Sequence, residues 1–166
     1  MEKKTKRLTI ILTTIYGFMV VWIILFKMAT LSEISNLGYI RNINLIPFYY
    51  DVERTYHLSE VMNNVVIFVP FGVYLKMLKL KSTKAILLGA GFSMVLEILQ
   101  FILGVGATDI TDVITNTLGV AIGVGIYCIL SRVFKKNEKL NKVLSILASI
   151  CTMLLVAFVA LLILLN

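Results

Sequence analysis

The stretch EILQFILGVGATDITDVITNTLGVAIG, residues 97–123, decides how this chain folds. It places three carboxylates and two amides among leucine, isoleucine and valine: Glu97, Gln100, Asp109, Asp112 and Asn116. Ionisable groups inside apolar segments are expensive in a membrane, so by default they mark a functional site or an internal ion network. We therefore treat the rest of the chain as the frame that holds this stretch.

The frame has the composition of a membrane protein. The 166 residues are 59% hydrophobic and 15% charged, and the mean hydropathy is +0.94, whereas soluble domains carry about 25% charged residues. Each of five apolar segments is near the ~20 residues that cross a bilayer as a helix: residues 8–26, 61–78, 85–103, 110–130 and 143–165. We predict an all-α, polytopic membrane bundle of about five transmembrane helices in a single domain, residues 1–166.

Lysine and arginine predict the orientation of this bundle. Thirteen of the 16 basic residues precede the first segment, lie around the turn between the second and third, or join the fourth to the fifth. By the positive-inside rule, the N-terminus is cytoplasmic and the C-terminus lies outside. The first segment is too long for a signal-peptide core and lacks a cleavage motif, so we expect it to be retained. Lipid headgroups account for the net charge of +7, and nucleic acid is not an expected partner.

Residues 28–60 form the long connection that this topology places outside the cell. The apolar sequence RNINLIPF, residues 41–48, is too short to span a bilayer and contains Pro47. We expect it to lie along the outer interface, where the tyrosines of the connection also fit. Two interpretations remain open for it, a flexible aromatic flap or a lid over the polar stretch.

Helical spacing gathers the polar residues into one stripe. Residues 109, 112, 116, 119 and 123 advance by three or four, and residues 85, 89, 93 and 97 advance by fours. Only residues 104–108 separate the two segments, which predicts antiparallel neighbouring helices. At 1.5 Å per residue, Glu97 and Asn116 lie about 10 Å from the turn, and Gln100 matches Asp112 nearer to it. We expect Gly119 and Gly123 to bring the same two helices close together.

Two interpretations of the stripe remain open. In the first, the polar groups form a satisfied internal network, with Thr108 or Asp109 capping the helix and Asp112 favoured by the helix dipole. In the second, they line a pocket that opens outward. Glu97 is too deep to cap a helix, so it must be protonated, paired with a cation such as Arg41, or open to water.

The same residues resemble the VanZ family. The resemblance rests on Glu97-x-x-Gln100 and on three runs: GATDITDVITNT at 106–117, NVVIFVPFG at 64–72 and NLIPF at 44–48, with LFK at 25–27 in addition. One departure is Val120, which follows Gly119 where the family often has a second glycine. The resemblance implies a bacterial inner-membrane (plasma-membrane) protein that lowers susceptibility to teicoplanin-type lipoglycopeptides.

Two mechanisms fit this resemblance. In the favoured one the chain is not an enzyme, and an outward-facing pocket binds an envelope component, such as a cell-wall precursor, or the drug. The ligand-binding residues are then the polar side chains expected near the outer face: Arg41, Asn44, Asn64, Glu97, Gln100, Asp109, Asp112 and Asn116. In the alternative, the protein modifies a lipid-linked precursor with Glu97 as acid or base, oriented by Asp109 and Asp112. His57 is the only histidine, so we expect no metal and no cofactor; the oligomeric state stays open.

Overall fold

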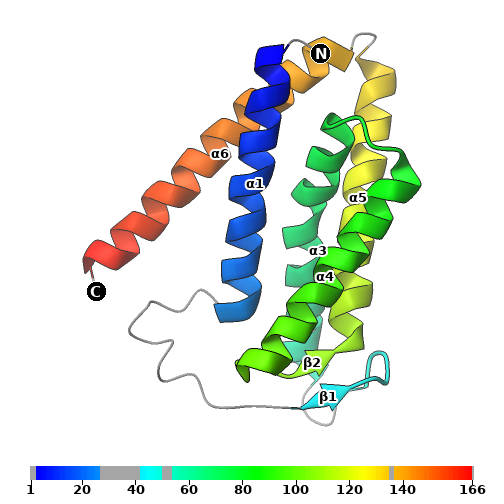
Figure 1. The fold of residues 1–166 in the computed structure, drawn as a ribbon, viewed down its shortest axis with the longest axis vertical. Coiled ribbons are helices and arrows are strands. Elements are labelled where there is room, and N and C mark those ends of the chain that lie inside the picture. The colour runs from blue at the N-terminus through cyan, green and yellow to red at the C-terminus, as the bar shows by residue number, and fades with distance from the viewer. Residues whose placement is uncertain (1–2, 27–41, 50–53, 135–136, 166) are drawn as a thin grey trace.

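The computed structural model describes residues 3–26, 42–49, 54–134 and 137–165. It contains five long helices: α1 (Lys3–Phe26), α3 (Arg54–Met77), α4 (Ser82–Leu103), α5 (Ile110–Val133) and α6 (Asn137–Leu165). Figure 1 shows α1, α3, α4 and α5 running alongside one another, while α6 diverges from α1 toward the C-terminus. Within the described residues, these four helices are long and apolar enough to cross a membrane. The predicted all-α membrane bundle is therefore confirmed.

The helix α3 begins seven residues before the apolar segment that predicted it. Its first residues, RTYHLSE at 54–60, are polar and carried no signal for a membrane span. Pro70 lies inside the helix and has no N–H, which leaves the carbonyl of Val66 without its usual helical donor. The next carbonyl, that of Ile67, accepts a hydrogen bond of 2.7 Å from the Tyr16 hydroxyl, which connects α3 to α1.

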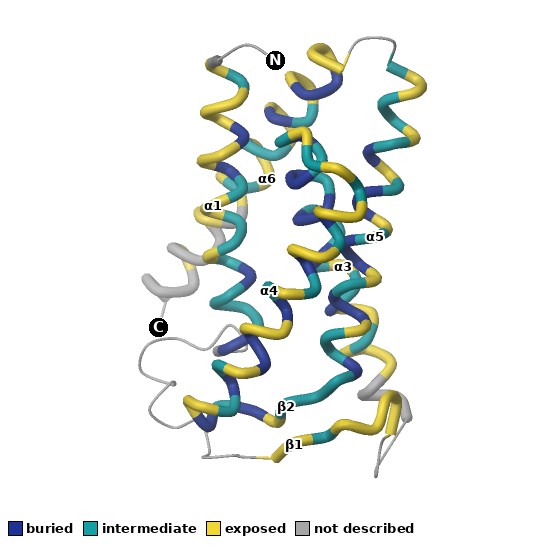
Figure 2. The backbone as a smooth tube through the Cα atoms, turned by 45° about the vertical axis from the view of Figure 1, so that its right-hand side comes forward, coloured by how far each residue is buried: buried dark blue, intermediate teal, exposed yellow. Residues whose placement is uncertain are grey.

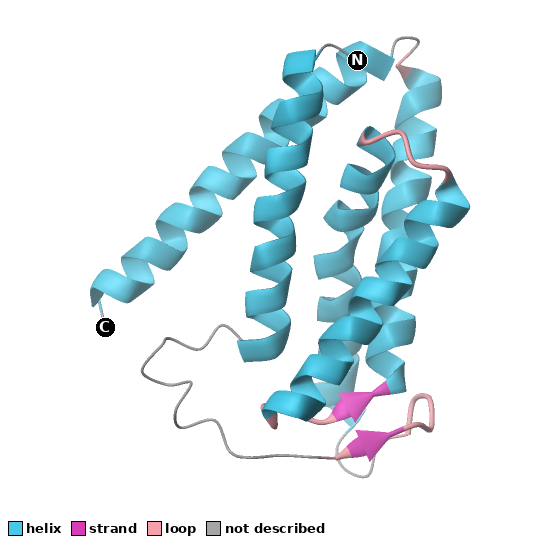
Figure 3. Ribbon diagram, viewed as in Figure 1, coloured by secondary structure: helices cyan, strands magenta, loops and turns pink. Residues whose placement is uncertain are grey.

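Two short strands were not predicted. Strand β1 (Ile43–Asn44) pairs in parallel with strand β2 (Thr108–Asp109), so that Ile43 lies opposite Thr108 and Asn44 opposite Asp109. The Thr108 N–H also donates to the Asn42 carbonyl at 2.9 Å. Figure 3 shows this pair at one end of the bundle, below α4 and α5. Two-residue strands are too short to show an alternating pattern, yet this pair fastens residues 42–44 to the α4–α5 turn.

Glycines bring α5 against α3, and the prediction that they face α4 is wrong. A Cβ atom on Gly119 would overlap the Val65 carbonyl oxygen, and one on Gly123 would overlap the Val69 carbonyl oxygen. In the opposite direction, a Cβ on Gly72 would overlap the carbonyl of Val120. The two backbones therefore meet directly, an approach that only glycine permits.

The helix α4 packs on a different face of α5. A Cβ on Gly89 would meet the methyl groups of Val120, the residue that departs from the family pattern. Because Val120 follows Gly119 by one residue, it lies about 100° farther around the helix. One face of α5 thus meets α3 through glycines, and the next meets α4 through a valine. Figure 2 shows the buried faces of the helices turned toward each other.

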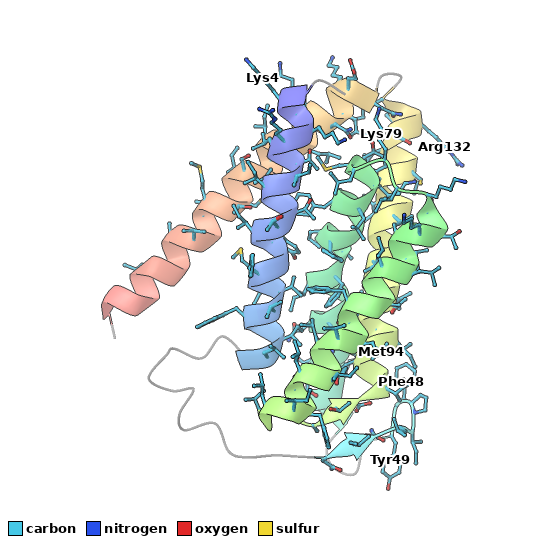
Figure 4. All side chains as sticks on the ribbon, in the orientation of Figure 1. Lys4, Phe48, Tyr49, Lys79, Met94 and Arg132 are labelled. Carbon is cyan, nitrogen blue, oxygen red and sulfur yellow. The ribbon has the colours of Figure 1, made fainter. Side chains whose placement is uncertain are left out.

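The two ends of the bundle differ in chemistry. Lys4, Lys79 and Arg132 lie at the end that holds the N-terminus, whereas Phe48 and Tyr49 lie at the opposite end (Figure 4). This separation agrees with the predicted gathering of basic residues on one side. Which side faces the cytoplasm stays a prediction, and we name the two ends the basic end and the strand end.

Candidate functional site

The polar site lies at the strand end, where α4 stops and α5 starts. Gly104 ends α4 in a left-handed conformation, with φ of 66°, and its N–H donates back to the Gln100 and Phe101 carbonyls. The Thr108 hydroxyl donates to the carbonyl of Glu97 at 3.0 Å, which folds the turn back onto the last turns of α4. The backbone around the turn therefore brings Glu97 close to the start of α5.

Glu97 is buried beneath this turn, with 2% of its surface exposed. Its Oε2 atom accepts a hydrogen bond of 2.9 Å from the backbone N–H of Asp109. Its Oε1 atom is buried and has no hydrogen-bond partner among the described residues. The expected pairing with Arg41 falls outside the described part of the chain. One oxygen of the carboxyl group is thus held by a hydrogen bond, while the other is buried without a partner among the described residues.

Asp109 caps α5, as the sequence predicted. One carboxylate oxygen accepts from the Thr111 N–H at 2.7 Å, and the other accepts from the Asn44 amide nitrogen at 3.0 Å. The Thr111 hydroxyl in turn accepts from the Phe48 N–H at 3.0 Å. The cap therefore also holds residues 44–48 over the start of α5.

Asp112 and Gln100 share the predicted region but have partners on other helices. The Asn64 amide of α3 donates to Asp112 at 2.8 Å, and the Gln100 amide donates to the Ile24 carbonyl of α1 at 3.1 Å. The inclusion of Asn64 in the candidate site is supported by this contact. The spacing of residues 97–123 could not predict these partners, because it describes only α4 and α5. The partners lie on α3 and α1.

Asn116 is paired one turn away from where the spacing placed it. Its amide donates to the Ser93 hydroxyl at 2.8 Å, and both residues are fully buried. The predicted alignment with Glu97 assumed that the two helices begin at the same level. Instead, strand β2 (Thr108–Asp109) follows the turn, and α5 begins only at Ile110. Ser93 lies one turn before Glu97 on the predicted stripe, but it was not among the candidate site residues.

Three acceptor atoms in this region lack a donor. They are Glu97 Oε1, Gln100 Oε1 and Asn116 Oδ1, all buried and unpaired within the described residues. A buried polar atom left without a partner costs about 1–3 kcal/mol. The arrangement can accept hydrogen bonds from an ammonium group, a hydroxyl group or water. Among the described residues, no three His, Cys, Asp or Glu side chains gather in a way that could hold a metal ion.

The fold and the site together define a polytopic membrane protein with a buried polar cluster at one end of its helices. The sequence matches the family described as VanZ/LLP1 over residues 13–132. It is also 35% identical over 154 residues to "Protein VanZ" of Enterococcus faecium, an alignment that covers 89% of each chain. No solved structure matches. The chain belongs to the VanZ/LLP1 family, and the matched region contains both short strands and every predicted site residue.

Proposed function

We propose that this protein lowers the susceptibility of a bacterial cell to teicoplanin-type lipoglycopeptides, acting in the plasma membrane through a polar cluster. The polar cluster comprises the described candidate residues: Asn44, Asn64, Glu97, Gln100, Asp109, Asp112 and Asn116. Membership of the VanZ/LLP1 family and four helices of membrane-spanning length support this proposal. In the proposed topology, the strand end faces outward, where such drugs and cell-wall precursors are found.

The observation that carries the binding proposal is the trio of unpaired acceptor oxygens on Glu97, Gln100 and Asn116. Glu97 and Gln100 are buried residues of α4, and Asn116 is a buried residue of α5. A ligand that presents hydroxyl or ammonium donors would satisfy them, whereas an apolar ligand would leave them unpaired. We therefore propose that the ligand is a donor-bearing part of an envelope component or of the drug itself.

One feature of Glu97 favours a second candidate, a membrane enzyme that acts on a lipid-linked precursor. A general base needs one free oxygen within hydrogen-bond reach of the substrate, and a carboxylate held by its other oxygen meets that requirement. Asp109 supplies that hold through its backbone N–H. Mass spectrometry of lipid extracts separates the candidates. A precursor that changes when the protein is present supports the enzyme, and unchanged lipids support binding.

The substitution Glu97→Gln tests the polar cluster. The glutamine oxygen can still accept from the Asp109 N–H, so we expect normal protein levels in the membrane. The position of the unpaired Oε1 atom then carries an NH₂ donor in place of an acceptor, and the side chain cannot ionise. We expect teicoplanin resistance to fall to that of cells without the protein, measured as the minimum inhibitory concentration beside membrane abundance.

A matched control comes from the basic end. There the Tyr127 hydroxyl donates to the Asn141 side chain at 2.8 Å, in a buried pair away from the polar cluster. Tyr127→Phe removes this hydrogen bond, whereas Glu97→Gln keeps the one from the Asp109 N–H, so the control should cost at least as much stability while leaving resistance intact. Full resistance in Glu97→Gln would contradict the proposal, since a neutral group would then suffice at this position.

Drug selectivity gives an independent test. Teicoplanin carries an acyl chain that can enter the membrane, and vancomycin does not. We expect protection against teicoplanin to exceed protection against vancomycin in otherwise identical cells. Equal protection against both drugs would contradict an explanation based on the lipid-bearing part of the drug.

A further inference from the structure

A cavity lies between α1 and α6 at the basic end, far from the polar cluster. Its volume is about 400 Å³, within the range of about 300–1,000 Å³ usual for small-molecule sites. The lining comes from the first turns of α1 and the second and third turns of α6: Lys4, Thr5, Leu8, Lys142, Ser145 and Ile146. Lys4 marks its position in Figure 4.

Ser145 lines this cavity and has an unsatisfied, buried hydroxyl. The residue is 2% exposed, and its Oγ atom has no hydrogen-bond partner in the described structure. Two nearby hydroxyls on the same helices are satisfied by their own helix: Thr9 donates to the Thr5 carbonyl at 2.8 Å, and Ser149 donates to the Ser145 carbonyl at 2.8 Å. Such back-bonding is the ordinary solution for serine and threonine in a helix. Ser145 departs from it and keeps a donor available.

The other walls of the cavity combine positive charge with apolar surface. Lys4 and Lys142 are exposed and come from different helices, so two cations face one space. Leu8 and Ile146 are 39% and 51% exposed and lie one turn farther along their helices than Lys4 and Lys142, toward the interior of the membrane. This order, cations first and hydrocarbon next, is the order of a phospholipid from headgroup to acyl chain.

We propose that this cavity binds an anionic phospholipid of the leaflet at the basic end. Lys4 and Lys142 contact the headgroup phosphate, the Ser145 hydroxyl donates to a phosphate oxygen, and Leu8 and Ile146 pack against the upper acyl chain. The proposal is independent of the proposed function, because α6 lies outside the family match at residues 13–132. The bound lipid would lie at the basic end, between the first turns of α1 and the second and third turns of α6.

Lipid-dependent thermal stability tests this proposal on the full chain in neutral detergent. Phosphatidylglycerol should raise the Tm of the wild type, while phosphatidylcholine of the same chain length should have little effect. Inorganic phosphate separates the two sources of the headgroup chemistry, and a full Tm shift with phosphate alone would overturn the lipid assignment. A shift of equal size with phosphatidylcholine would also overturn it, because the lysines would then not be selecting for charge.

Two variants assign the effect to this cavity. The double variant Lys4→Gln/Lys142→Gln should weaken phosphatidylglycerol binding about thirtyfold, and Ser145→Ala about tenfold. The control Lys81→Gln/Lys84→Gln removes the same charge from exposed positions at the start of α4 that do not line the cavity. It should bind like the wild type. Unchanged binding in Ser145→Ala, a substitution that leaves the fold intact, would overturn the proposal, as would equal loss in the control.

Discussion

The stripe on α5 has two halves, first Asp112 and Asn116 and then Gly119 and Gly123, which share one helical spacing but hold the bundle together in opposite ways. In the first half, Asp112 and Asn116 reach side chains on α3 and α4 through hydrogen bonds of 2.8 Å. In the second half, Gly119 and Gly123 have no side chain and let the α3 backbone approach directly. Contact in the first half depends on polar side chains, whereas contact in the second half depends on the lack of a side chain. Substitutions in the two halves should therefore separate site from scaffold.

The largest effect is expected in the glycine half. In Gly119→Leu, the new side chain would meet the carbonyl of Val65 and the side chain of Phe68, both in the α3 segment that contacts α5. A clash with backbone should cost at or above the upper end of about 1–3 kcal/mol. We expect the protein to disappear largely from the membrane, with resistance lost as a consequence. Immunoblotting of membrane fractions measures this.

The control for that experiment is another glycine of the same helix. A Cβ on Gly125 meets no described atom within 4 Å. Gly125→Leu should therefore leave membrane abundance unchanged, and leucine is also the better helix former. Equal loss of protein in the two variants would contradict the assignment of Gly119 to the α3 contact. It would instead indicate a general intolerance of bulk in α5.

An intermediate effect is expected in the polar half. In Asp112→Asn, the side-chain oxygen can still accept from Asn64, so the link between α3 and α5 survives. Loss of the charge near the helix N-terminus should cost about 0.3–1 kcal/mol, too little to remove the protein from the membrane. We expect lowered resistance at near-normal abundance. A drop in abundance matching that of Gly119→Leu would show that Asp112 belongs to the scaffold.

The same comparison explains what the sequence could predict. Apolar runs of about 20 residues predicted the helices, and spacing by threes and fours predicted which residues of α5 share a face. Neither signal predicts which helix packs against a given face. The glycines were therefore assigned to α4 although they meet α3, and Asn116 was aligned with Glu97 although it binds Ser93. Sequence neighbours are not always the closest spatial neighbours, and only packing decides between them.

The strand pair was missed for a different reason. Two residues on each side carry no periodic signal, and the pairing joins segments more than 60 residues apart. Asn44 and Asp109 were both named as site residues, yet their contact could not be derived from their positions in the sequence. Their pairing also gives residues 44–48 a defined place, which is compatible with the lid interpretation over α5.

The smallest effect is expected at Asn44, which lies on β1 at the rim of the polar cluster. Its amide nitrogen donates to Asp109 at 3.0 Å and more weakly to the Tyr49 carbonyl at 3.3 Å. A hydrogen bond in a partly exposed place contributes about 0.5–1.5 kcal/mol, and the backbone pairing of β1 with β2 survives substitution. Asn44→Ala should therefore keep normal abundance and reduce the teicoplanin inhibitory concentration only a few-fold.

Asn42→Ala is the matched control for this last experiment. Among the described residues, the Asn42 side chain accepts from the N–H of its neighbour Ile43, at 2.9 Å, and it is exposed. Both variants remove one asparagine side chain from the same short segment, but only Asn44→Ala releases the Asp109 cap from residues 44–48. If the two variants are indistinguishable in resistance, the strands serve the fold alone. The functional part of the polar cluster would then begin deeper, at Glu97 and Asp112, and Asn44 would belong to the scaffold together with the glycines.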